Sequence, residues 1–140
     1  TANQTIERIM NLYPEERHKQ VLIDLAMNLV GIIGQRLVVK KGGKGRTAIV
    51  DLMINTPAVQ DLVFKGDLMG IKELMTRGQG DGMQTFDQHL FDLYVAGTID
   101  YDEAIRQADS ANDLRLRIQL YEEGNKPDHI FDRVSDLNLI

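Results

Sequence analysis

The sequence predicts a mainly α-helical fold that contains one β-hairpin. Apolar residues recur at helical spacing through most of the chain, two β-branched runs flank a glycine-rich loop, and capping residues precede the helical runs. The 140 residues, 43% hydrophobic and 26% charged, have the composition of a soluble globular domain. Because the chain has no cysteine, its composition excludes disulfide scaffolds, thiolate zinc sites and cysteine nucleophiles.

The first 55 residues are expected to form two helices and the hairpin. Ile6, Ile9 and Met10 predict a short helix over residues 3–12, and Pro14 opens a second helix whose apolar stripe runs over residues 21–33. Residues 36–40 and 47–54 then predict two strands joined by a flexible loop at 41–45. In the second strand the alternating residues share one face: Ala48, Val50, Leu52 and Ile54.

The rest of the chain reads as five further helices. Thr56 and Pro57 predict the start of one, and Asp67 predicts the start of the next, which ends before the glycine-rich turn at 78–82. A helix follows from about residue 83 and stops at Gly97. Asp100 with Glu103 resembles a capping box, and Ser110 or Asn112 opens a last helix. After Gly124 the pattern becomes polar and irregular.

The formal charge of −5 is divided unevenly along the chain. Residues 1–55 hold eight basic and five acidic side chains, a charge of +3, whereas residues 56–140 carry −8. An acidic second half argues against nucleic-acid binding, because the phosphate backbone repels it. Five basic residues between Arg36 and Arg46 are free to meet an acidic partner or a neighbouring nucleotide. No apolar run approaches the ~20 residues of a membrane span, so we expect no membrane insertion.

No catalytic or metal centre can be assigned from spacing. The loop Gly42–Thr47 lacks the glycine and the Ser or Thr of a phosphate-binding loop, since Val38 and Gly45 occupy those places. His18, His89 and His129 lie far apart and form no recognised metal spacing. We therefore predict no catalytic residue and no metal ligand, and assign no cofactor-binding residue.

Several short motifs, in order and at characteristic intervals, resemble one family. They are Gln35-Arg36-Leu37, the loop at 43–46, Asn55-Thr56-Pro57 and the segment Gly82, Met83, Gln84, Thr85, Phe86, Asp87 and Gln88. Over residues 1–123 the chain resembles the C-terminal part of the PilT/PilU ATPases, hexameric secretion-type motors that retract type IV pili. Phe86 and the run at 112–116 resemble the PilU branch more closely.

The resemblance implies that the chain is the back part of a longer motor. Residues 1–55 would end a RecA-like ATPase core, residues 56–123 would form a helical C-terminal subdomain, and residues 124–140 would be a flexible tail. The Walker A and Walker B motifs of the family precede the segment present here. ATP and Mg would thus bind elsewhere in the parent, and this chain would be inactive and hold no cofactor.

The resemblance also implies partners and a place in the cell. The parent would assemble as a hexamer of identical subunits and act on a pilus platform protein or a sister retraction ATPase. It would be cytoplasmic, at the periphery of the inner-membrane pilus machinery.

One helix and one motif are the candidate sites. The resemblance implies that residues 58–65 occupy the place of the surface helix linked to retraction in PilT-type proteins. The predicted partner or motor interface is Ala58, Val59, Leu62, Val63 and Phe64, although Phe64 has the alternative of packing against the next helix. The motif residues 82–88 are expected to be mainly structural, with Met83, Phe86 and Leu90 in the core and Gly82 and Thr85 setting the start of a helix.

The competing reading is a stand-alone helical adaptor that binds other proteins and never had a motor domain. An in-frame Gly-x-x-x-x-Gly-Lys-Ser/Thr loop upstream of Thr1 would select the motor, and a native Met start just before Thr1 would select the adaptor. If a core has been removed, apolar surface should be bared, and we expect self-association through the stripe from Val21 to Ile33.

Overall fold

The computed structural model describes residues 1–77 and 81–125. Helices dominate these residues and one antiparallel hairpin runs through them, so the predicted mainly α fold with a β-hairpin is confirmed. The elements, in chain order, are α1 (Ala2–Asn11), the 3-10 helix η1 (Glu15–Arg17), α2 (His18–Asn28), β1 (Gly31–Val39), β2 (Arg46–Ile54), α3 (Pro57–Lys65), α4 (Leu68–Arg77), α5 (Phe86–Val95), α6 (Tyr101–Gln107) and α7 (Ala111–Gly124).

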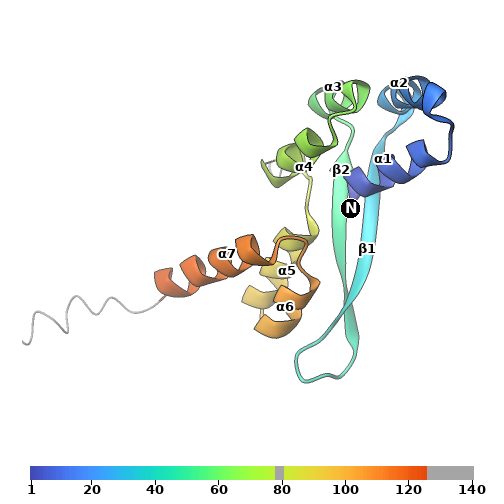
Figure 1. The fold of residues 1–140 in the computed structure, drawn as a ribbon. Helices are drawn as coiled ribbons and strands as arrows, with labels where there is room; N and C mark the ends of the chain where they lie inside the picture. Colours follow the sequence, from blue (N-terminus) through green and yellow to red (C-terminus); the bar gives the residue numbers. More distant parts are fainter. Residues whose placement is uncertain (78–80, 126–140) are drawn as a thin grey trace, which may run out of the picture.

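The hairpin is the long axis of the molecule (Figure 1). Its register runs from Gly31 opposite Ile54 to Val39 opposite Arg46, so each strand has nine residues. The first strand therefore begins five residues before the predicted start at Arg36. The pattern misled because Gly31, Ile32 and Ile33 also fit a helical stripe, and only their pairing with β2 identifies them as strand.

The predicted continuation of the second helix to Ile33 is wrong. Helix α2 ends at Asn28, and Leu29 has an extended backbone with ψ of 133°. The Asn55 side chain accounts for this end, because its Nδ2 donates to the carbonyl oxygens of Ala26 (3.1 Å) and Leu29 (2.6 Å). Val30 and Ile33 consequently lie outside the helix and are 86% and 74% exposed.

Side-chain caps begin most of the helices, as the sequence predicted. Thr56 and Thr85 accept hydrogen bonds from Val59 N and Gln88 N, and Asp67 accepts from Gly70 N. Asp100 accepts from Glu103 N at 2.8 Å, but the Glu103 carboxylate does not complete a capping box. It is buried instead and accepts from Val39 N of the hairpin at 2.9 Å.

The buried side chains form two clusters along one face of the hairpin. The first cluster joins α1–α4 to one end of the hairpin, where Ile32 and Met53 are buried. The second joins α5–α7 to the other end, where Val38 and Ile49 are buried. The buried face of β2 is thus the one that carries Ile49, Asp51 and Met53, while Ala48, Val50, Leu52 and Ile54 share the other face.

Phe86, a member of the second cluster, packs against the middle of the hairpin. It is 3% exposed, and a Cβ added to Gly34 would lie 3.3 Å from the Phe86 ring, so the ring packs directly on the strand backbone. Because α3 and α4 share the first cluster with α1 and α2, the hydrophobic clusters do not divide the chain at residue 55. Most of the predicted tail, from residue 126 onward, lies outside the described residues.

Candidate protein-interaction surface

Helix α3 presents a short surface at one end of the molecule. Thr56 caps the helix, Pro57 occupies its first turn, and Gly66, with φ of 69°, ends it. Val59 and Val63 are completely buried and Leu62 packs partly against the same core, so these side chains are committed to the fold. Only Ala58 and Phe64 of the five predicted interface residues are exposed.

Phe64 does not pack into the next helix, since it is 55% exposed. It borders a shallow depression of about 360 Å³ between α2 and α3, which is lined by Ala26, Met27, Pro57, Gln60, Asp61 and Phe64. Met27 on the α2 side is 71% exposed. Two large exposed apolar side chains around one depression form a surface typical of protein contact.

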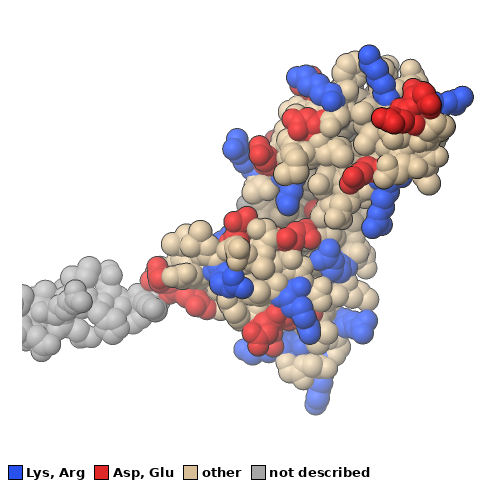
Figure 2. Space-filling model, viewed as in Figure 1, with Lys and Arg blue, Asp and Glu red and all other residues tan. Residues whose placement is uncertain are grey.

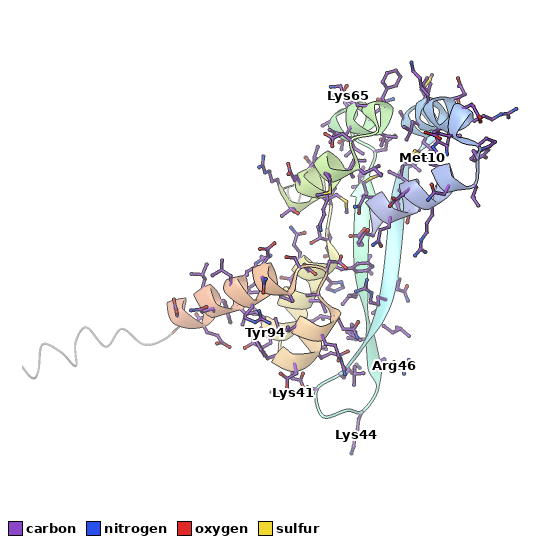
Figure 3. All side chains as sticks on the ribbon, viewed as in Figure 1. Met10, Lys41, Lys44, Arg46, Lys65 and Tyr94 are labelled. Atoms are coloured by element: carbon purple, nitrogen blue, oxygen red, sulfur yellow. The ribbon has the colours of Figure 1, made fainter. Side chains whose placement is uncertain are left out.

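The polar side of α3 carries a single ion pair. Lys65 Nζ lies 2.8 Å from Asp61 Oδ2, one helical turn away, and Lys65 stands at the end of α3 in Figure 3. The hydrogen bond to Asp61 raises the pKa of the Lys65 ammonium. Both side chains are well exposed, so solvent screens the pair and it adds little stability.

The segment from Gly82 to Gln88 fastens α5 to the hairpin. Gln84 forms an isolated bridge with Leu52, with N···O distances of 2.7 and 3.0 Å, and its side chain donates to the Val50 carbonyl at 2.7 Å. Gly82 enters this bridge with φ of 83°, a backbone conformation that favours glycine. The segment thus covers part of the outer edge of β2.

The remaining residues of this segment bind α4, α5 and the start of α7. Thr85 and Gln88 form a capping box, so the predicted helix start is confirmed, and Gln88 Nε2 donates to the Thr76 carbonyl. Asp87 accepts from the backbone amides of Asp109 (2.8 Å) and Ser110 (2.9 Å). Met83, Phe86 and Leu90 are buried, as expected for core residues.

Arg36, part of the first predicted motif, ties the hairpin to the loop between α6 and α7. Its guanidinium lies 4.6 Å from the Phe86 ring centroid and donates to the Gln107 carbonyl at 2.8 Å. It also lies 3.5 Å from the Asp109 carboxylate. These contacts make Arg36 a structural side chain.

Three buried or partly buried polar groups were missed by the sequence reasoning. Asp51 is 2% exposed and accepts from Ala2 N at 2.9 Å, while burial raises the pKa of its carboxyl group. His89 Nδ1 accepts from Val50 N at 2.9 Å, and Glu103 accepts from Val39 N. The only sequence signal was a charged residue at a strand position, Asp51, between apolar neighbours.

In residues 1–77 and 81–125 no group of three or more His, Asp or Glu side chains is arranged to hold a metal ion. None of the helices within these ranges has the length and apolar character of a membrane span. His129 lies outside the described residues.

Comparison with known proteins places these features in context. No protein-family model matches the chain. It is 47% identical over 138 residues, 99% of its length, to the type IV pilus ATPase PilU of Pseudomonas aeruginosa, covering 36% of that protein. It is also 33% identical over 77% of its length to the P. aeruginosa type IV pilus retraction ATPase PilT, covering 31% of it.

Solved structures agree in fold. The crystal structure of the pilus retraction motor PilT with bound ADP superposes with a TM-score of 0.71 at 34% identity, over 81% of this chain and 31% of that one. The Legionella pneumophila ATPase DotB shares the fold alone, with a TM-score of 0.59 at 17% identity over 74% of this chain and 28% of that one. The chain spans about a third of the length of its PilU and PilT relatives. Within that span, its sequence and fold are similar to those of the C-terminal part of the type IV pilus ATPases PilU and PilT.

Proposed function

We propose that this chain is the C-terminal part of a hexameric ATPase motor for type IV pilus retraction and twitching motility. In the longer protein, residues 1–55 end a RecA-like core, residues 56–123 form the helical C-terminal subdomain and residues 124–140 form a tail. The longer protein hydrolyses ATP with Mg, in the cytoplasm at the periphery of the inner-membrane pilus machinery. The chain itself contributes structure and contact surface, because its 140 residues contain no phosphate-binding loop.

The uncovered side of the hairpin is the observation that carries this proposal. On the face away from the helices, Ile33 and Leu37 of β1 are 74% and 51% exposed. Among the described residues β1 pairs with no strand other than β2, and on its other edge Val39 N donates to the Glu103 side chain rather than to a strand. An apolar sheet face next to an unpaired edge is what remains when the neighbouring part of a larger sheet is absent.

The exposed surface of α3 suits the contact role in this proposal. Ala58, Phe64 and Met27 are accessible from outside while Val59 and Val63 hold the helix on the core. A sister ATPase or a pilus platform protein that packs on this helix would bury an aromatic side chain, which is typical of a strong contact point.

Nucleotide binding tests the proposal directly. Titration calorimetry of the 140-residue chain with Mg-ATP should give no micromolar affinity, whereas the longer protein, expressed from its own in-frame upstream sequence, should bind ATP and hydrolyse it. Micromolar binding by the short chain would contradict the predicted absence of a nucleotide site. An upstream reading frame without a phosphate-binding loop, or a native Met start immediately before Thr1, would instead favour the stand-alone adaptor.

A further inference from the structure

The tip of the β-hairpin carries a cluster of exposed cations. We call residues 40–46 the basic tip, because Lys40, Lys41, Lys44 and Arg46 lie within seven residues and no Asp or Glu occurs between Asp24 and Asp51. Three glycines with φ between 72° and 89° shape the turn. Lys44 extends from the end of the loop, away from the helices (Figure 3).

The basic tip is held in a defined place. Lys41 N donates to the Thr98 carbonyl at 2.9 Å, which ties the tip to the loop between α5 and α6. Within the tip, Lys40 N donates to the Gly45 carbonyl and Gly43 N donates to the Lys40 carbonyl, both at 3.0 Å. The cations therefore stand on an ordered turn, so less backbone entropy is lost when a partner binds them.

An acidic surface lies at one end of the α5–α7 unit. At the start of α5, Asp87 binds the Ser110 amide at the start of α7, and near the end of α5 the Tyr94 hydroxyl donates to Glu122 near the end of α7. Helices α5 and α7 thus run in the same direction, and their C-terminal ends lie together. The Tyr94 and Tyr101 ring centroids, 6.4 Å apart, bring the start of α6 to the same end.

We call this surface the acidic end. It consists of four exposed carboxylates, those of Asp100, Asp102, Glu122 and Glu123. Glu122 and Glu123 lie in the last turn of α7, which contains no basic residue, although the helix dipole favours cations there. From Phe86 to Gly124 the chain has nine acidic and three basic residues. A cation brought to this end would relieve both the charge repulsion and the unfavourable dipole interaction.

The fold leaves these two surfaces unpaired with each other. The ion pairs within residues 1–77 and 81–125 join Arg36 to Asp109, Lys65 to Asp61 and Arg106 to Glu103, and none of them uses the basic tip or the acidic end. Lys40 lines the same pocket as Asp100 and Asp102 without forming an ion pair with either. Figure 2 shows basic side chains at the hairpin tip and acidic ones at the end of α7.

We propose that the basic tip of one copy docks on the acidic end of a second copy of this chain. Each copy carries both surfaces, so the contact can repeat around a closed assembly. A second copy is favoured as the partner, because it supplies an exposed acidic surface that no ion pair among the described residues occupies. The inference does not depend on the proposed motor function, since an adaptor could associate in the same way.

A charge-reversal exchange tests this contact on the full 140-residue chain. Lys41→Glu with Lys44→Glu reverses the tip, and Glu122→Lys with Glu123→Lys reverses the acidic end. Sedimentation velocity at low salt should show each variant self-associating at least about tenfold more weakly than the unaltered chain. An equimolar mixture of the two variants should recover association, because each reversed tip then meets a reversed acidic end. The association should weaken as salt is raised.

A matched control and a competing partner complete the test. Arg17→Glu with Lys19→Glu changes the net charge by the same amount at exposed positions far from the tip and should leave association unchanged. Far-UV circular dichroism of all variants checks that they are folded. Unchanged association of the tip variant, or a mixture that associates no better than its components, would overturn the proposal. So would tip-dependent pelleting with phosphatidylglycerol vesicles in the absence of any self-association.

Discussion

At the scale of single residues, the most informative side chain is the carboxyl group of Asp51. It is buried on the inner face of the hairpin and accepts a hydrogen bond from Ala2 N, at the beginning of α1. Loss of hydration on burial raises the pKa of this carboxyl group, although the hydrogen bond from Ala2 and the charge of the N-terminal amine oppose the change. Asp51 therefore links β2 to α1 through its hydrogen bond, but its ionised form stabilises the folded chain less than its neutral form does.

Asp51 should give the stability of the chain a pH dependence of defined sign. Because the folded-state pKa lies above the ordinary value of 3.8, the folded chain binds the proton more tightly than the unfolded chain. The contribution of Asp51 to the free energy of unfolding therefore falls as the pH rises from about 4 through the folded-state pKa. Asp51→Asn cannot ionise, and its amide oxygen can still accept from Ala2.

Urea unfolding at a series of pH values measures this effect. The free energy of unfolding of Asp51→Asn, relative to that of the unaltered chain, should increase as the pH rises from 4 towards 7. Asp92→Asn, at an exposed position on α5, controls for the loss of one carboxylate from an acidic chain. A constant difference between the Asp51→Asn and unaltered curves would show that burial does not destabilise the ionised group.

At the scale of elements, local signals predicted where helices begin better than where α2 ends. Thr56, Thr85 and Asp100 each bind an amide three residues ahead, so their partners are visible in the sequence. The end of α2 depends on Asn55, which lies 26 residues beyond Leu29. Similarly, Asp51 binds an amide 49 residues away. Such contacts cannot be inferred from periodicity, because they depend on how distant elements pack.

The candidate sites also depend on how distant elements pack. The family motifs directed attention to the segment at 82–88 and to helix α3, yet the family pattern could not divide the α3 side chains into buried and exposed ones. Val59 and Val63 turned inward because the first cluster lies on that side of α3, whereas Phe64 points to solvent. Orientation on a short helix depends on the position of its neighbours, which a single sequence does not encode locally.

Two phenylalanines allow the connecting segment before α5 to be tested. Phe86, 3% exposed, joins the helices to the hairpin, whereas Phe64 is 55% exposed on α3. Phe86→Ala should lower the free energy of unfolding by about 3–5 kcal/mol, because it leaves a cavity between Gly34 and the second cluster. Phe64→Ala should change it by about 0.5 kcal/mol or less.

Chemical unfolding monitored by circular dichroism compares these two variants under identical conditions. Equal effects would show that Phe86 does not bear the predicted packing role. A large effect of Phe64→Ala alone would place that side chain in the core, against the exposed position described above.

At the scale of the whole molecule, one hairpin carries two hydrophobic clusters. Helices α1–α4 cover one end of it and α5–α7 cover the other. Contacts inside each cluster are extensive, while the connection between the clusters depends on the strands and the segment at 82–88. The two ends should therefore respond separately to local damage.

Ile71→Ala and Leu90→Ala test this separation, because both side chains are completely buried, one in each cluster. Each variant should lose about 2–5 kcal/mol of unfolding free energy. In hydrogen exchange followed by mass spectrometry, Ile71→Ala should speed exchange mainly in α1–α4 and Leu90→Ala mainly in α5–α7. Equal acceleration at both ends by either variant would mean that the molecule opens only as a single unit.

The paired strands also have a mechanical consequence. Nine residues per strand span roughly 26 Å at the usual rise of a β-strand. The hairpin is thus a rigid element that fixes the distance between the two hydrophobic clusters at its ends. A push on the helices at one end would load the ladder of interstrand hydrogen bonds lengthwise, in shear, where all the rungs resist together. Displacement would thus pass along the molecule without being absorbed by a hinge.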